Sequence, residues 1–201
     1  MSELHSSAKT ILKSYTDRYV KLSEEESEAL WNALTYRKIA RKEYLLEPGQ
    51  TCKSQYFILE GCFRTYYIDQ KGNEQIMHFA IEHWWMTDYD SLNNQQPSEM
   101  FIQALEPAVI LQIDLDALNN LFDQYPKIDR LFRIIAEKTF IAAQRRLQHM
   151  LSLRREEMLD TFQAGSFSFS DRVPQYMIAS YLGFTPEFLS MIRAKKRNEK
   201  K

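Results

Sequence analysis

The chain has 201 residues, which is enough for one large domain or two small ones. Apolar residues make up 44% and charged residues 26%, a composition typical of a folded soluble protein. No apolar run approaches the roughly 20 residues of a membrane-spanning helix, and the N-terminal residues contain no apolar signal core. We therefore expect a cytoplasmic protein without a membrane partner.

The two cysteines, Cys52 and Cys62, are too few for a Cys-based zinc or iron–sulfur site. Without an export signal they are expected to be reduced thiols. His78, Glu82 and His83 do not have the spacing of a recognised metal motif. We therefore expect neither a cofactor nor a metal.

Charge is distributed unevenly along the chain. Residues 126–201 carry 15 Lys and Arg against 8 Asp and Glu, a net charge of +7, whereas residues 1–125 carry 11 against 19, a net charge of -8. A basic C-terminal part suits a polyanionic partner, but a solvated helix surface rich in Lys and Arg gives the same charge. Charge alone leaves both interpretations open.

Residues 4–35 are expected to form helix in two pieces. The second piece begins at Ser23, a favourable N-cap residue, with Glu26 three positions later to complete a capping box. After residue 35 the pattern changes to short strands separated by turn residues, which is typical of an antiparallel barrel or roll. The predicted strands are residues 36–46, 55–60, 62–68, 74–81, 101–105 and 109–113.

Helical patterns return after the last strand. Asp114 is expected to cap a short helix over 115–122, and Pro126 to open a long one. Residues 127–164 contain no glycine or proline, so the helix is expected to be unusually long, with a break near Ser152. Its broad apolar stripe must be buried either against the roll or against a second copy of the chain, and the second possibility predicts a homodimer.

Residues 173–193 have the spacing of a helix-turn-helix. Pro174 is expected to begin the first helix, Ala179 to lie where the helices cross, and Gly183 to end that helix with a positive φ. Thr185 is expected to cap the second helix, and Leu189 to anchor it. An ordinary corner between two helices is the alternative interpretation.

A helix-turn-helix implies DNA binding, because its second helix enters the major groove. Glu187 is expected to contact a cytosine amino group, or alternatively only to favour the positive end of the helix. Ser190 is expected to contact a base or a phosphate, and the cations that follow to contact phosphates. The predicted DNA-binding residues are Thr185, Glu187, Ser190, Arg193, Lys195 and Lys196.

The order of roll, long helix and helix-turn-helix resembles the Crp/Fnr family of bacterial transcription regulators, in the form common in Bacteroidetes. The resemblance implies an α+β fold with a cyclic-nucleotide-binding-like β-roll over residues 1–125, a dimerisation helix over 126–151 and a helix-turn-helix domain over 152–201. It further implies a dimer that binds double-stranded DNA and senses an effector in the roll. The residues that carry it are 46–49 (LEPG), 57–61 (FILEG), Pro126 and its helix, 178–187 (IASYLGFTPE), Leu189 and Ser190.

The chain departs from the family where cyclic nucleotides bind. Family members that bind them supply a Gly-Glu pair and a later Arg-Ser or Arg-Thr pair, but residues 79–86 and 96–101 contain neither glycine nor arginine. Glu99 stands near the position of the arginine, where it would repel a phosphate. We therefore expect an effector other than cyclic AMP, or none. The candidate pocket residues are Glu82, Trp84, Trp85 and Ser98, with core packing as the alternative for the tryptophans.

Two further departures bear on function. Met191 stands where the family often has a basic residue, and few residues follow the second helix, so any wing there is expected to be short or absent. These features favour the alternative of an effector-binding or oligomerisation module that has lost DNA binding. An enzyme is not expected, because none of the nucleophile, phosphate-loop or zinc motifs occurs in the sequence.

Overall fold

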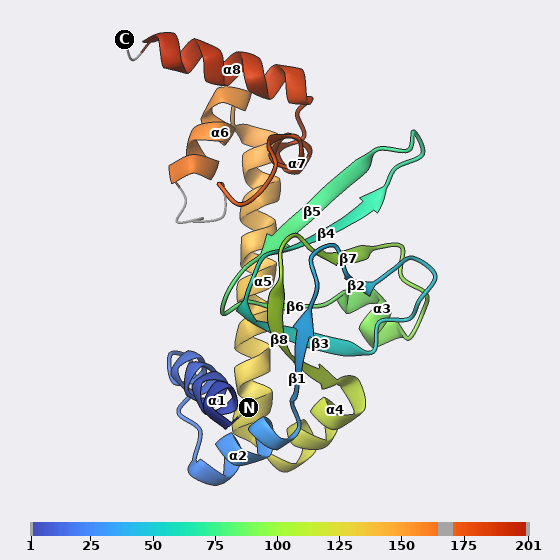
Figure 1. Cartoon of the computed structure of the whole chain (residues 1–201), viewed down its shortest axis with the longest axis vertical. Coiled ribbons are helices and arrows are strands. Elements are labelled where there is room, and N and C mark those ends of the chain that lie inside the picture. The colour runs from blue at the N-terminus through green and yellow to red at the C-terminus, as the bar shows by residue number, and fades with distance from the viewer. Residues whose placement is uncertain (1, 165–170, 200–201) are drawn as a thin grey trace. The chain divides into compact units, whose positions relative to one another are not determined.

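The computed structural model describes residues 2–164 and 171–199, with side chains for all of these except 2–4, 163–164 and 196–199 (Figure 1). The chain divides into two compact units, one made of residues 1–65 and 79–140 and the other of residues 66–78 and 141–201. The boundaries expected from the sequence, at residues 125 and 151, stay predictions.

The first unit begins with two helices, α1 (Ser2–Thr16) and α2 (Glu24–Asn32). At the start of α2 the Ser23 Oγ accepts a hydrogen bond from the Glu26 N–H at 3.1 Å, and the Glu26 carboxylate accepts one from the Ser23 N–H at 2.6 Å. The predicted capping box is therefore confirmed.

A four-stranded sheet forms the centre of this unit. Its strands, in spatial order, are β1 (Thr35–Ile39), β8 (Ala108–Asp114), β3 (Ser54–Glu60) and β6 (Trp85–Met86). The pairs β1–β8, β3–β8 and β3–β6 are all antiparallel. The second sheet has the order β2 (Tyr44–Leu46), β7 (Phe101–Ala104), β4 (Phe63–Ile68) and β5 (Glu74–Ala80).

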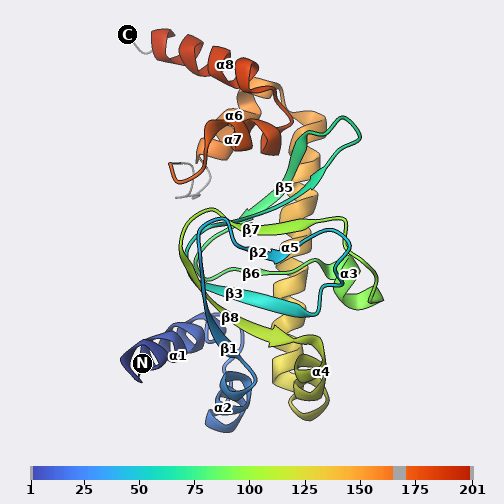
Figure 2. The ribbon, with the colours of Figure 1, turned by 45° about the vertical axis from the view of Figure 1, so that its right-hand side comes forward.

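Both faces of β3 are buried, because the central sheet lies between two cores. Tyr56 and Ile58 pack in the core between the sheets, whereas Phe57 and Leu59 face the opposite side. That second core is completed by α1, α2, α4 (Leu115–Gln124) and the first half of α5 (Pro126–Ser152). Figure 2 shows α1, α2 and α4 gathered at one end of the roll. The α+β roll expected from the sequence is confirmed.

The turn between β3 and β4 depends on a glycine. Gly61 has a φ of +112°, and a Cβ atom at this position would lie 2.4 Å from the Cβ of Ala108. No other residue type fits both the conformation and the space.

Four details differ from the sequence prediction. The strand predicted over residues 36–46 is two strands, β1 and β2, which belong to different sheets. The strand β6 and the helix α3 (Tyr89–Asn94) were not predicted. Asp114 stands at the N-cap of α4 but makes no side-chain cap; its carboxylate instead accepts hydrogen bonds from Ser54 Oγ at 2.6 Å and Gln112 Nε2 at 3.1 Å. The expected side-chain cap is therefore wrong, because Ser54 on the neighbouring strand β3 and Gln112 on β8 itself both donate to the same oxygen.

The long helix α5 starts at Pro126 and ends at Ser152, as predicted. Its first half is buried through Ile128, Leu131, Phe132 and Ile135. The second unit contains the rest of α5, the tip of the β4–β5 hairpin, α6 (Arg155–Ala164), α7 (Gln175–Leu182) and α8 (Pro186–Glu199).

Candidate nucleic-acid interface

The helices α7 and α8 form the predicted helix-turn-helix. Pro174 is the N-cap residue of α7, one position before the helix rather than inside it. Gly183 ends α7 with a φ of +72°, and the Phe184 N–H then donates to the Ala179 carbonyl oxygen at 2.8 Å. This closing bond brings the chain into α8 within three residues, because glycine adopts the left-handed conformation without strain.

The start of α8 is capped as expected. The Phe188 N–H donates to Thr185 Oγ1 at 3.2 Å, and Glu187 lies in the first turn. A cap and an acidic first turn stabilise the N-terminal end of a helix. The stabilised N-terminal end is also the end of α8 that would enter a major groove.

One face of α8 is buried in the second unit and the other is open. Leu189 and Ile192 are 1% and 2% exposed. The helix contacts α7. The other buried apolar residues of this part of the chain are Met158, Leu159, Phe162, Val173, Met177, Ile178, Ala179, Leu182 and Phe184. The ring of Phe188 also lies under the guanidinium of Arg155, at 4.8 Å. The helix is therefore held in place from behind.

The open face carries most of the predicted DNA-binding residues. Thr185, Glu187 and Ser190 are exposed, and Met191, which follows Ser190, is 58% exposed. Lys195 is exposed and forms an ion pair with Glu156 at 3.1 Å. Lys196 lies in α8, but its side chain falls outside the described residues.

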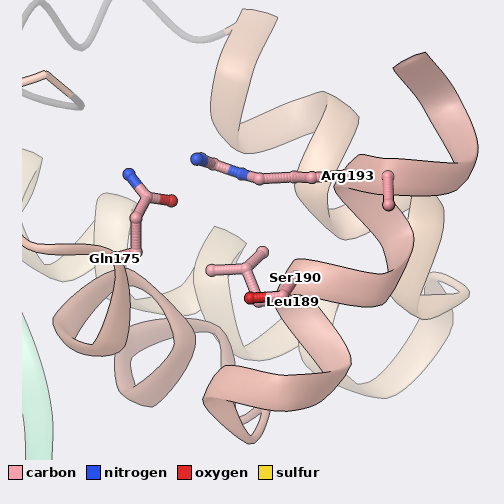
Figure 3. Close-up of a pocket in the computed structure, with 5 residues that line it drawn as sticks. Gln175, Leu189, Ser190 and Arg193 are labelled. Atoms are coloured by element: carbon pink, nitrogen blue, oxygen red, sulfur yellow. The ribbon is translucent and has the colours of Figure 1, made fainter.

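Arg193 is less exposed than the other predicted DNA-binding residues whose side chains are described. Its side chain is half-buried, and its Nε atom is fully covered without a hydrogen-bond partner among the described residues. It borders a hollow of about 310 Å³ that is also lined by Gln175, Leu189, Ser190 and Ala194. Figure 3 shows Arg193 and Gln175 reaching toward the same space from α8 and from the start of α7. Gln175 was not among the predicted site residues, although the sequence pattern places it in the first turn of the predicted helix.

The four predicted effector-pocket residues occupy different places. The Glu82 carboxylate accepts a hydrogen bond from the Gly61 N–H at 2.9 Å, next to the β3–β4 turn. Trp84 is 39% exposed, whereas Trp85 is 9% exposed and packs on Phe57 and Phe132, with ring centroids 5.3 and 4.8 Å apart. Trp85 is therefore a core residue of the roll.

Ser98 lies in a polar corner that the sequence analysis did not predict. Its Oγ donates to the Asp88 carboxylate at 2.6 Å. The same carboxylate accepts the N–H groups of Asp90 and Ser91, at 3.1 and 3.4 Å, at the start of α3. Helix N-terminal N–H groups and a hydroxyl are donors that suit an anion, and here a side chain of the protein itself uses them.

Neither a metal-binding cluster nor a membrane-spanning helix is found in the described part of the chain. No cluster of three or more His, Cys, Asp or Glu side chains is placed to hold a metal ion there. Within the same residues, no helix combines the length and the apolar character needed to cross a bilayer.

Comparison with known proteins agrees with this geometry. Residues 36–125 match the cyclic nucleotide-binding domain family. The chain is 29% identical to the anaerobic regulatory protein of Pasteurella multocida over 184 residues, which cover 85% of this chain and 66% of that protein. The chain thus spans slightly less than two thirds of this relative's length.

Solved structures show the same fold. The structure of FixK2 from Bradyrhizobium japonicum has a TM-score of 0.70 at 16% identity, covering 83% of this chain and 85% of that chain. The c-di-GMP-responsive global regulator CLP of Xanthomonas campestris has a TM-score of 0.71 at 13% identity, with coverages of 88% and 93%. At these identities the likeness is one of fold: the chain resembles these structures in its backbone arrangement.

Proposed function

We propose that the protein is a dimeric, sequence-specific, DNA-binding transcription regulator whose roll does not bind a cyclic nucleotide in the usual way. The observation that supports DNA binding most directly is the open face of α8. The helix is anchored by Leu189 and Ile192, while Thr185, Glu187 and Ser190 remain exposed along its N-terminal half. A helix held from behind and exposed in front is what major-groove insertion requires.

The assignment of single contacts follows from position. Exposed residues near the N-terminus of α8 would reach base edges, with Glu187 accepting from a cytosine amino group. Arg193, Lys195 and Lys196 would hold phosphates and supply affinity without sequence information. Two such helices in a dimer would read half-sites one turn apart, about 34 Å. The regulator would act in the cytoplasm, where bacterial transcription takes place.

The homodimer is proposed from the second half of α5. Phe140, Leu147 and Leu151 are 63%, 57% and 80% exposed, and each lies on the same stripe at intervals of seven and four residues. Apolar side chains at this spacing form the seam of a two-stranded coiled coil. A second copy of α5 is the occupant that this pattern fits.

The experiment is a selection of duplexes from a random pool by the full-length chain, followed by titrations of the selected duplex at several salt concentrations. We expect a palindrome, and an affinity that falls steeply with salt. Replacing Lys195 and Lys196 by Gln should weaken binding to all sequences and reduce the salt slope by about 0.9 for each lost phosphate contact.

The matched control removes two charges from the first unit, through Lys38→Gln and Arg41→Gln, both exposed. This variant should bind as the wild type does. Binding that is weak, insensitive to salt and without sequence preference would favour the other candidate function, an effector-binding or oligomerisation module, which the exposed Met191 on α8 supports.

A further inference from the structure

The strand β5 lies at the edge of its sheet and is bonded on its open side by a helix. Strand β4 is its neighbour, and β5 is the last strand in the order of this sheet among the described residues. The Ser180 hydroxyl of α7 donates to the Glu74 carbonyl oxygen at 2.7 Å and accepts from the Ile76 N–H at 3.0 Å. One side chain thus satisfies two main-chain groups that an edge strand otherwise leaves unpaired.

Arg146 of α5 makes a second connection at the same place. Its guanidinium donates to the carbonyl oxygens of Met77, Ile76 and Tyr181, the last two at 3.2 and 2.8 Å. It also lies over the Tyr181 ring, 4.2 Å from the centroid. A planar group with several fixed donors can bind three carbonyls at once, which the ammonium of lysine cannot do in the same geometry. Arg146 therefore joins α5, β5 and α7.

These contacts affect α8 because a short turn, closed by a hydrogen bond, joins α7 to α8. Ser180 lies one turn before Gly183, and the three-residue turn is closed by the bond from Phe184 to Ala179. Ala179 and Leu189 are both fully buried where the helices meet. An orientation imposed on α7 is therefore passed to α8.

We propose that Ser180 and Arg146 are positioning residues for DNA recognition. Their hydrogen bonds to the main chain of β5, which we call the latch, hold β5 and α7 together and so keep α8 in the orientation that reads sequence. This inference rests on the proposed function and adds two residues that touch no DNA. Losing the latch leaves the basic side chains of α8 in place, so it lowers specific affinity far more than non-specific affinity.

The first measurement needs no DNA. Hydrogen exchange of the full-length chain is followed in the peptides that cover β5 and α7, for the wild type and for Ser180→Ala, Arg146→Gln and Ser180→Thr. We expect exchange at Ile76 to become at least about tenfold faster in the first two variants, because its N–H loses its acceptor or that acceptor's support. Ser180→Thr keeps the hydroxyl and should restore slow exchange. Unchanged exchange in Ser180→Ala would refute the latch.

The second measurement compares the selected duplex with poly(dI–dC) as a non-specific probe. Ser180→Ala should bind the selected duplex about tenfold more weakly and poly(dI–dC) within twofold of the wild type, and Ser180→Thr should recover specific binding. Faster exchange with unchanged or increased specific affinity would overturn the positioning role. A wild type that binds neither DNA would refute the proposed function and the positioning role together, while the exchange result would still decide the latch.

Discussion

The surroundings of His78, on β5, lower the pKa of its imidazole. Burial, with the positive charge of Arg146 as a second cause, lowers the pKa of His78 from 6.5 to about 4. The unfolded chain therefore takes up this proton as the pH falls below about 6.5, whereas the native state takes it up only near 4. As far as this histidine is concerned, the free energy of unfolding is therefore highest above pH 6.5. It decreases progressively as the pH falls from 6.5 to 4.

Urea unfolding at pH 7.5 and pH 4.5 checks this prediction. His78→Gln should show a smaller decrease in the free energy of unfolding between the two pH values than the wild type. His149→Gln removes another histidine of the second unit and should leave the decrease in place. An equal decrease in the wild type and His78→Gln would assign the pH dependence to other groups.

Asp88 determines what the polar corner beside α3 accepts. Its carboxylate already uses Ser98 Oγ and two N–H groups, and it would repel a phosphate brought to the same donors. We expect no heat of binding when millimolar cyclic AMP is titrated into the protein. Binding in the micromolar range would show that this assignment of the corner is wrong.

Two capping residues were predicted correctly, and in both cases the partner is close in sequence. Ser23 with Glu26, and Thr185 with Phe188, are each three residues apart. Asp114 failed because its partner Ser54 is 60 residues away, and a sequence pattern carries no sign of that neighbour. The bond between Asp88 and Ser98 was missed for the same reason, since it depends on the path of α3.

Among the elements, the second half of α5 gives a direct test of the dimer. Leu147→Glu places a charge in the proposed seam, where a like charge from the partner would face it, and should shift the protein to monomer in sedimentation velocity. Gln148→Glu adds the same charge to the same turn but outside the stripe, and should remain a dimer. Monomeric wild-type protein at micromolar concentration would contradict the proposed seam.

The recognition helix α8 offers a gain-of-function test. Met191 is 58% exposed on the open face. Met191→Arg adds a cation there, so we expect several-fold tighter binding to the selected duplex and a steeper salt dependence by about 0.9. Met191→Gln has a similar length without charge and should bind as the wild type does. An identical salt slope for the arginine and glutamine variants would place this residue away from the DNA.

Elements were predictable where several signals coincide. The long helix and the helix-turn-helix combine proline, glycine, caps and apolar period. The ends of α5 and the end of α7 at Gly183 agree with the prediction, whereas α7 begins one residue after Pro174. Strand β6 has two residues, Trp85 and Met86, and exists only because it pairs with β3. Such a short strand has no period of its own, so a sequence pattern cannot reveal it.

On the scale of the whole molecule, the two units are not consecutive pieces of chain. Residues 66–78 belong with 141–201, because Arg146 and Ser180 bond to a strand about 70 and 104 positions earlier. A division drawn along the sequence assigns this hairpin to the roll. The sequence does indicate that β3 is buried on both faces, since this strand appears as a continuous apolar run.

The polar corner at Asp88 has a consequence for folding. Asp88 supplies its own carboxylate to Ser98 and to the first N–H groups of α3, so these donors are satisfied without an external anion. The corner can therefore form in a chain that has met no small anion, such as one refolding from denaturant in a phosphate-free buffer.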